Sequence, residues 1–168
     1  MSKAISLPYP EIAALLGGRK LLGDEPDSQL GFADRISKGL PAGSVLRLKE
    51  ALGVTEAELA RLLGVSSRTL ARLRLGVVKS GLRAGEPIRI GDALARQVLD
   101  PSLSDRAYRL AFLLAQARRL LGEEGAVQWL KSPQRGVAGR IPLDLATTEA
   151  GAREVEALLH RIAHGVYT

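Results

Sequence analysis

The sequence predicts an all-α fold, and three observations predict it. Leucine, isoleucine and valine recur at spacings of three and four residues along most of the 168-residue chain, as on the buried face of a helix. Glycines and prolines fall where these stretches end, and serine or threonine residues that can cap a helix precede several of them. Only residues 88–90, Ile-Arg-Ile, alternate as a short strand does. We therefore expect a set of helices joined by turns.

The first 27 residues carry the weakest helical signal. Prolines and glycines interrupt them, so that only residues 12–16 are expected to form a short helix. Residues 28–40 fit a longer helix that ends near Gly39. We treat residues 1–27 as a variable segment and assign residues 28–75 to the first domain.

Three short helices are expected between residues 43 and 75. The first ends at Gly53 and the second at Gly64, because glycine readily adopts the left-handed conformation that closes a helix. The second opens with a capping box, in which Thr55 accepts from the backbone N–H of Glu58 and Glu58 reaches back.

The second and third of these helices are interpreted as a helix-turn-helix motif over residues 56–73. Ala60 is small enough to let the two helices approach closely, Gly64 permits the tight turn, and Ser66 caps the third helix. The alternative is a plain helical hairpin with a basic outer face.

One segment carries the whole net charge of +6. Residues 61–96 hold eight basic and two acidic residues, and the rest of the chain is balanced. Such a local excess indicates an anion-binding surface, usually for nucleic acid. No aromatic residue lies between Phe32 and Tyr108, so the segment lacks the rings on which single-stranded bases stack. Duplex DNA is therefore the expected partner, read by a helix in the major groove.

The third helix supplies the candidate DNA contacts. Arg68 and Arg72 are four residues apart and share a face, from which Arg68 can give two hydrogen bonds to a guanine edge. Neighbouring hydroxyls can contact bases or phosphates. The residues expected to bind DNA are Ser66, Ser67, Arg68, Thr69, Arg72 and Arg74.

Residues 76–103 are expected to form a linker with some structure of its own. Six glycines and prolines divide this segment. Besides the strand at residues 88–90, it fits a short helix over residues 92–99.

The C-terminal region, residues 104–168, is expected to be strongly helical. Ser104 is the predicted cap of a long helix that ends at Gly122, and a second helix follows as far as residue 130.

A stiff loop over residues 131–141 is expected next, because it contains one proline and two glycines. Pro142 fits the first turn of a short helix, Thr148 caps the last helix, and Gly165 closes that helix. The apolar face of the last helix consists of Val155, Leu158, Leu159 and Ile162.

No catalytic site, metal site or cofactor is expected. The chain has no cysteine, and Arg161 follows His160 where a metalloprotease with a second histidine at His164 would need a glutamate. Glu123 and Glu124 are adjacent and diverge on a helix, so they form no acid–base pair. The longest run without a charged residue is eight residues, too short for a membrane span. We therefore expect a cytoplasmic protein that is not an enzyme.

Five stretches of the C-terminal region occur in the order and spacing of a known family. They are Ser-Asp-Arg-Ala-Tyr-Arg-Leu at 104–110, Trp-Leu-Lys-Ser-Pro at 129–133, Gly-Arg-Ile-Pro-Leu-Asp-Leu at 139–145, Gly-Ala-Arg-Glu-Val at 151–155 and Ile-Ala-His-Gly-Val-Tyr at 162–167. With them, the chain resembles the toxin-binding domain of the Xre/MbcA/ParS antitoxins. The helix-turn-helix, with Arg-Thr-Leu-Ala-Arg at 68–72, resembles the N-terminal half of the same family.

The resemblance implies an antitoxin of a bacterial type II toxin–antitoxin system. In this family the cognate toxin is a RES-domain protein that consumes NAD⁺ or uses it for ADP-ribosylation. The antitoxin covers the toxin's NAD site with its C-terminal domain, and it binds and represses the promoter of its own operon, usually as a dimer. The implied partners are therefore a RES-domain toxin, duplex promoter DNA and a second copy of the chain. Compared with the family, residues 76–103 look like an insertion.

The loop over residues 131–141 and the C-terminal tail are the predicted toxin-binding elements, since they combine rigidity with basic groups that suit an anionic-ligand pocket. The single tryptophan is either a core residue under a basic loop or, with the loop, an anchor for a protein partner. The two roles are compatible, because a buried ring can brace an exposed loop. The candidate toxin-binding residues are Trp129, Lys131, Pro133, Arg135, Arg140, Val166 and Tyr167. Two alternatives stay open: a stand-alone regulator whose C-terminal domain only dimerises, and an NAD-related or metal-dependent enzyme.

Overall fold

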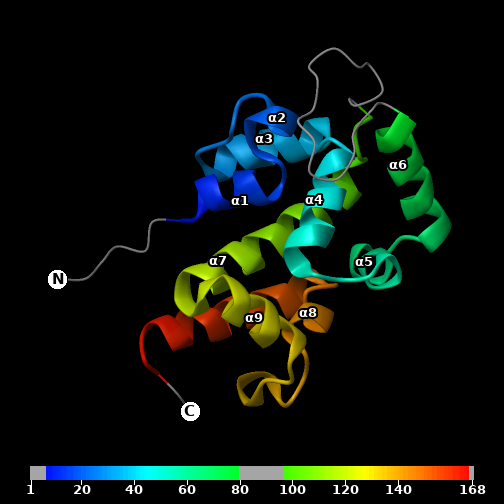
Figure 1. Cartoon of the computed structure of the whole chain (residues 1–168). Coiled ribbons are helices and arrows are strands. Elements are labelled where there is room, and N and C mark those ends of the chain that lie inside the picture. Colours follow the sequence, from blue (N-terminus) through cyan, green and yellow to red (C-terminus); the bar gives the residue numbers. More distant parts are fainter. Residues whose placement is uncertain (1–6, 80–96, 167–168) are drawn as a thin grey trace.

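The computed structural model describes residues 7–79 and 97–166, and this part of the chain is built of helices (Figure 1). Within these residues the β-pairing is limited to two isolated bridges, so the all-α prediction is confirmed. The strand predicted at residues 88–90 lies outside the described residues. The elements in order are α1 Tyr9–Leu15, α2 Gly18–Leu22, α3 Gln29–Lys38, α4 Gly43–Leu52, α5 Glu56–Leu63, α6 Ser67–Lys79, α7 Pro101–Lys131, the 3-10 turn η2 Arg135–Val137, α8 Pro142–Leu145 and α9 Glu149–Ala163.

Helices α1 and α2 belong to the core, although the sequence predicted only one short helix in this segment. α1 buries Ile12 and Leu15, and α2 buries Leu22. Between them Gly17 and Gly18 have φ values of 108° and 58°, so the chain turns sharply and starts a second helix at once. The glycine pair that looked like an interruption is therefore the turn that lets both helices pack.

The predicted start and stop signals of α5 and the predicted cap of α6 are confirmed. The Thr55 hydroxyl accepts from Glu58 N at 3.2 Å and Glu58 Oε2 accepts from Thr55 N at 2.7 Å, which completes the capping box. Gly64 ends α5 with a φ of 64°. The Ser66 hydroxyl caps α6 by accepting from Thr69 N at 3.0 Å. α6 continues about one turn beyond its predicted end.

Helix α7 begins earlier than predicted, and Ser104 is not its cap. Asp100 is the N-cap, since its carboxylate accepts from Leu103 N at 2.9 Å, and Pro101 occupies the first turn. Ser104 is fully buried inside the helix, and its hydroxyl accepts from Leu40 N at 2.9 Å. The prediction was wrong because aspartate and serine cap helices equally well, and the contact with Leu40 decides between them.

Residues 97–99 are extended, whereas the sequence predicted a helix over residues 92–99. Leu99 N donates to Leu40 O at 2.8 Å, and Ala42 N donates to Gln97 O at 2.7 Å. The end of the predicted linker is thus fastened to the start of α4. The rest of the predicted helix lies outside the described residues.

Helix α7 is the central element of the fold. It packs against α1, α3, α4 and α5, and also against α8 and α9, and it runs between these two groups in Figure 1. At Gly122 the backbone leaves the helical region, with φ 76° and ψ 176°, so the predicted break is confirmed. One continuous cluster of buried apolar side chains extends from α1 to α9. The two halves of the chain therefore share one core.

The last two helices follow the prediction. Pro142 lies in the first turn of α8, and the Thr148 hydroxyl caps α9 by accepting from Gly151 N at 3.1 Å. The predicted apolar face of α9 points into the core, where Val155 and Leu159 are fully buried.

Candidate DNA-binding helix and partner-binding surface

Helix α6 turns its arginines to solvent. Arg68 and Arg72 are exposed, and Leu70, on the opposite face, is 1% exposed. Leu73 also packs against the core. The apolar face fixes the rotation of the helix about its axis and so directs the basic face outward.

The six residues predicted to contact DNA differ in whether they already make hydrogen bonds or ion pairs within the chain. The Ser66 hydroxyl caps the helix and lies 2.9 Å from the Thr69 hydroxyl. Arg74 Nε lies 3.8 Å from Glu56 Oε1 on α5. Three candidates make no hydrogen bond or ion pair with any residue of the described ranges: Ser67, Arg68 and Arg72.

The loop between α7 and α8 is held in a defined shape. Gln134 N donates to Arg140 O at 3.0 Å. Ala138 has a φ of 56°, the one positive φ of a non-glycine residue in the described ranges. Arg161 of α9 donates to Gly136 O at 3.1 Å, so the loop also leans on the last helix. This structure agrees with the predicted stiffness.

Three of the predicted toxin-binding residues are exposed on this loop, namely Pro133, Arg135 and Arg140. Trp129 is partly buried against the core, and its carbonyl accepts from the Gln134 side chain at 2.9 Å. The end of α7 and the loop are thus joined through the Trp129 backbone, while the tryptophan ring packs against the core.

The other candidates lie in different surroundings. The Lys131 ammonium donates to Gly53 O at the end of α4, so it is engaged inside the molecule. Val166 is 54% exposed after the end of α9. Tyr167 lies outside the described residues.

The two predicted surfaces do not overlap. In Figure 1, α6 stands at the right edge, and the ochre loop that follows α7 hangs at the bottom. In this view α5 and α8 lie between them. DNA on α6 and a protein on the loop would thus occupy separate places.

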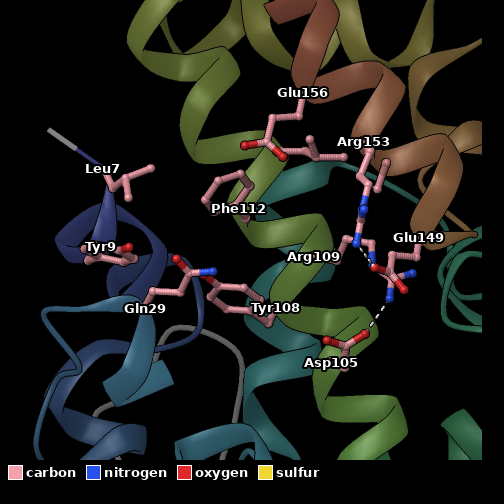
Figure 2. Close-up of a pocket in the computed structure, with 12 residues that line it drawn as sticks. Leu7, Tyr9, Gln29, Asp105, Tyr108, Arg109, Phe112, Glu149, Arg153 and Glu156 are labelled. Atoms are coloured by element: carbon pink, nitrogen blue, oxygen red, sulfur yellow. Dashed lines mark hydrogen bonds and ion pairs between the residues drawn. The ribbon is translucent and has the colours of Figure 1, made fainter. Parts of the chain in front are cut away.

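The structure also contains a groove that the sequence did not predict (Figure 2). Its volume is about 480 Å³, with α1 on one side, α9 on the other and α7 as its floor. The rings of Tyr9, Phe32, Tyr108 and Phe112 follow one another beside it at centroid distances of 4.9 to 6.0 Å. Their spacing in sequence gave no sign that α1 and α3 would meet α7 here. Ion pairs line the rim: Arg109 with Asp105, and Arg153 with Glu149.

Among the described residues, two groups have shifted pKa values, and neither indicates acid–base chemistry. Hydrogen bonds from the backbone and hydroxyl of Thr55 lower the pKa of Glu58. Burial raises the pKa of Tyr108 to about 12, so its hydroxyl stays protonated near neutral pH. The first group is a helix cap and the second is part of the aromatic row.

The histidines form a pair at the C-terminal end of α9, where His164 is the C-cap, with 3.1 Å between the Nε2 atoms of His160 and His164. Over the described ranges, no three histidine, aspartate or glutamate side chains gather as a metal site would require. None of the helices described here has the length and apolar character of a membrane span.

Two family models match the chain. Residues 31–84 match the antitoxin Xre-like helix-turn-helix domain, and residues 116–165 match the antitoxin Xre/MbcA/ParS C-terminal toxin-binding domain. An antitoxin Xre of Pseudomonas putida is 30% identical over 132 residues, which are 78% of this chain and 70% of the relative. An antitoxin Xre of Yersinia enterocolitica is 28% identical over 139 residues, 82% of this chain and 81% of the relative.

Among solved structures, the crystal structure of the M. tuberculosis MbcT–MbcA toxin–antitoxin complex contains a chain with 24% identity and a TM-score of 0.48. The match covers 76% of this chain and 96% of that one. The two family models and the P. putida relative show that the chain belongs to the Xre/MbcA/ParS family of antitoxins, with a helix-turn-helix domain ahead of a toxin-binding domain.

Proposed function

We propose that this antitoxin neutralises a RES-domain toxin that consumes NAD⁺ by covering its active site, and that it represses its own operon by binding the promoter. The observation that carries the proposal is the combination, on one chain, of a helix-turn-helix with outward arginines and a toxin-binding domain. The RES fold of the toxin and its NAD⁺ chemistry come from the family resemblance of residues 104–167.

The exposed face of α6 supports the DNA-binding part of the proposal. Arg68 and Arg72 stand one turn apart, and neither is tied to another described residue. An arginine in this position can donate to O6 and N7 of one guanine in the major groove. One such helix reads a half-site, so we propose that a homodimer binds the operator.

The loop after α7 supports the toxin-binding part. Its guanidinium groups, on Arg135 and Arg140, are exposed and suit the anionic pocket of an enzyme that binds a dinucleotide. Because the hydrogen bonds of Gln134 already fix the loop, little ordering entropy is lost when it binds.

Co-expression with the adjacent open reading frame tests the proposal. We expect the neighbour alone to stop growth and lower cellular NAD⁺, and the pair to grow normally and to purify as a complex. The antitoxin should also retard a duplex that carries the DNA upstream of its own gene. Retardation of this duplex with no complex and no rescue of growth would favour the stand-alone regulator instead.

A further inference from the structure

A single arginine of the C-terminal half contacts the turn of the helix-turn-helix. Arg106 lies on α7, 43 residues beyond its acceptor, and its Nη1 donates to Leu63 O at 2.8 Å. The same nitrogen lies 3.5 Å from Gly64 O. These carbonyls end α5, where the helix leaves its acceptors unpaired and the dipole favours a cation.

The turn has room for this guanidinium because Gly64 has no side chain. A Cβ at Gly64 would stand 2.2 Å from Arg106 Nη1, far inside contact distance. The φ of 64° at Gly64 also disfavours any side chain. Gly64 thus serves two purposes: it closes α5, and it admits Arg106.

We infer that Arg106 is a positioning residue for operator recognition, because it fixes the α5–α6 turn and thereby the tilt of α6. This inference rests on the DNA binding proposed above. The turn comprises three residues between α5 and α6, so a small change in its shape moves Arg68 and Arg72 over the bases. Base contacts tolerate displacements of only about 0.5 Å, whereas contacts to phosphates through flexible side chains tolerate more.

The contact has a matched counterpart on the same helix. Arg118 of α7 donates to Ala51 O at 3.3 Å, near the end of α4 and away from the α5–α6 turn. Both arginines join α7 to a helix end of the DNA-binding half. Of the two, only Arg106 contacts the residues that lead into α6. Arg118→Ala is therefore the control for a general weakening of the contact between α7 and the helix-turn-helix half.

The test compares specific and non-specific DNA binding by the full-length chain. The probes are a duplex carrying the DNA upstream of its own gene and a mixed-sequence duplex of equal length. For Arg106→Ala we expect the ratio of the two affinities to fall about tenfold, as for one disturbed base contact, with little change on the mixed duplex. Arg106→Lys should recover part of the ratio, and Arg118→Ala should keep the wild-type ratio.

Circular dichroism and thermal unfolding show whether each variant is folded. If Arg106→Ala does not fold, Gly64→Ala and Arg106→Lys carry the test, since each disturbs the same contact and a fall in the ratio is expected for both. A folded variant of Arg106 with the wild-type ratio, or an equal loss on both duplexes, would overturn the inference alone. Wild-type protein that does not prefer the upstream duplex would overturn the proposed function, and this inference with it.

Discussion

Arg68 shows how a single side chain acquires a binding role from its surroundings. It stands on an exposed face, and no described carboxylate holds it. Arg74, two turns along the helix, lies close to Glu56 and would have to leave that carboxylate before it met DNA. The two arginines thus differ in how readily they can contact DNA.

Replacement of Arg68 by alanine tests the more accessible of these two candidate DNA contacts. We expect operator binding to weaken by about 1–3 kcal/mol, because a bidentate contact to a guanine edge is lost. Mobility-shift titration at one fixed salt concentration measures the change. Arg19→Ala, which removes an exposed arginine on α2, serves as the control. Equal affinities for wild type and a folded Arg68→Ala would remove Arg68 from the interface.

The capping box at Glu58 is expected to make the stability of the fold depend on pH. Its pKa is lowered in the folded chain by hydrogen bonds from Thr55, so the ionised group stabilises the fold at pH values above the ordinary glutamate pKa of about 4.3. This stabilisation is lost as the pH falls through the lowered pKa of the folded state. We expect the difference in Tm between wild type and Glu58→Gln to be largest near neutral pH and to shrink in acid. A difference that is constant with pH would contradict this role.

At the scale of whole elements, the kink in α7 depends on one glycine. Gly122 has a φ of 76° and a ψ of 176°, a combination that is nearly restricted to glycine, although a Cβ there would meet no atom within 4 Å. Gly125, three residues later, lies in a regular helix, and its Cβ would have ordinary contact with Leu121 at 3.4 Å.

These two glycines give opposite predictions. Gly122→Ala should destabilise the chain by about 1–3 kcal/mol through backbone strain alone. Gly125→Ala should be neutral or stabilise it by up to about 1 kcal/mol, because alanine is the better helix former. Urea denaturation of both variants measures the difference. Similar stabilities would mean that α7 straightens at little cost.

The loop after α7 makes a prediction of its own, which rests on the proposed function. Removal of both exposed guanidiniums, with Arg135→Ala and Arg140→Ala, should lower the affinity for the co-expressed toxin at least about tenfold, since charged hydrogen bonds are the strong ones. Pull-down and calorimetry measure it, with Lys20→Ala on α2 as the control. Unchanged affinity in the double variant would move the toxin contact elsewhere.

Signals that act over a few residues could be predicted from the sequence, and contacts between distant segments could not. The caps at Thr55 and Ser66 and the break at Gly122 depend on local backbone chemistry, and all three are confirmed. Ser104 was mistaken for a cap because its partner, Leu40, lies 64 residues away. The candidate sites show the same difference. Helical periodicity was enough to predict that Arg68 is exposed, but it could not predict that Lys131 donates a hydrogen bond to Gly53 O, 78 residues away.

On the scale of the whole molecule, the shared core makes the two halves dependent on each other. Ser104 is one of the contacts that join them, because its buried hydroxyl satisfies the N–H of Leu40. Ser104→Ala should cost about 1–3 kcal/mol, the penalty for an unpaired buried donor. Denaturant unfolding measures it, and Ser102→Ala, an exposed position in the same turn, is the control. Equal stabilities of the two variants would show that water replaces the serine.

Helix α7 also couples the stability of one half of the chain to that of the other. Because α7 packs against helices of both halves, unfolding of one half is expected to destabilise the other. A toxin that binds only the folded chain would therefore stabilise the helix-turn-helix half as well, by about 2.7 kcal/mol at a hundred times its Kd.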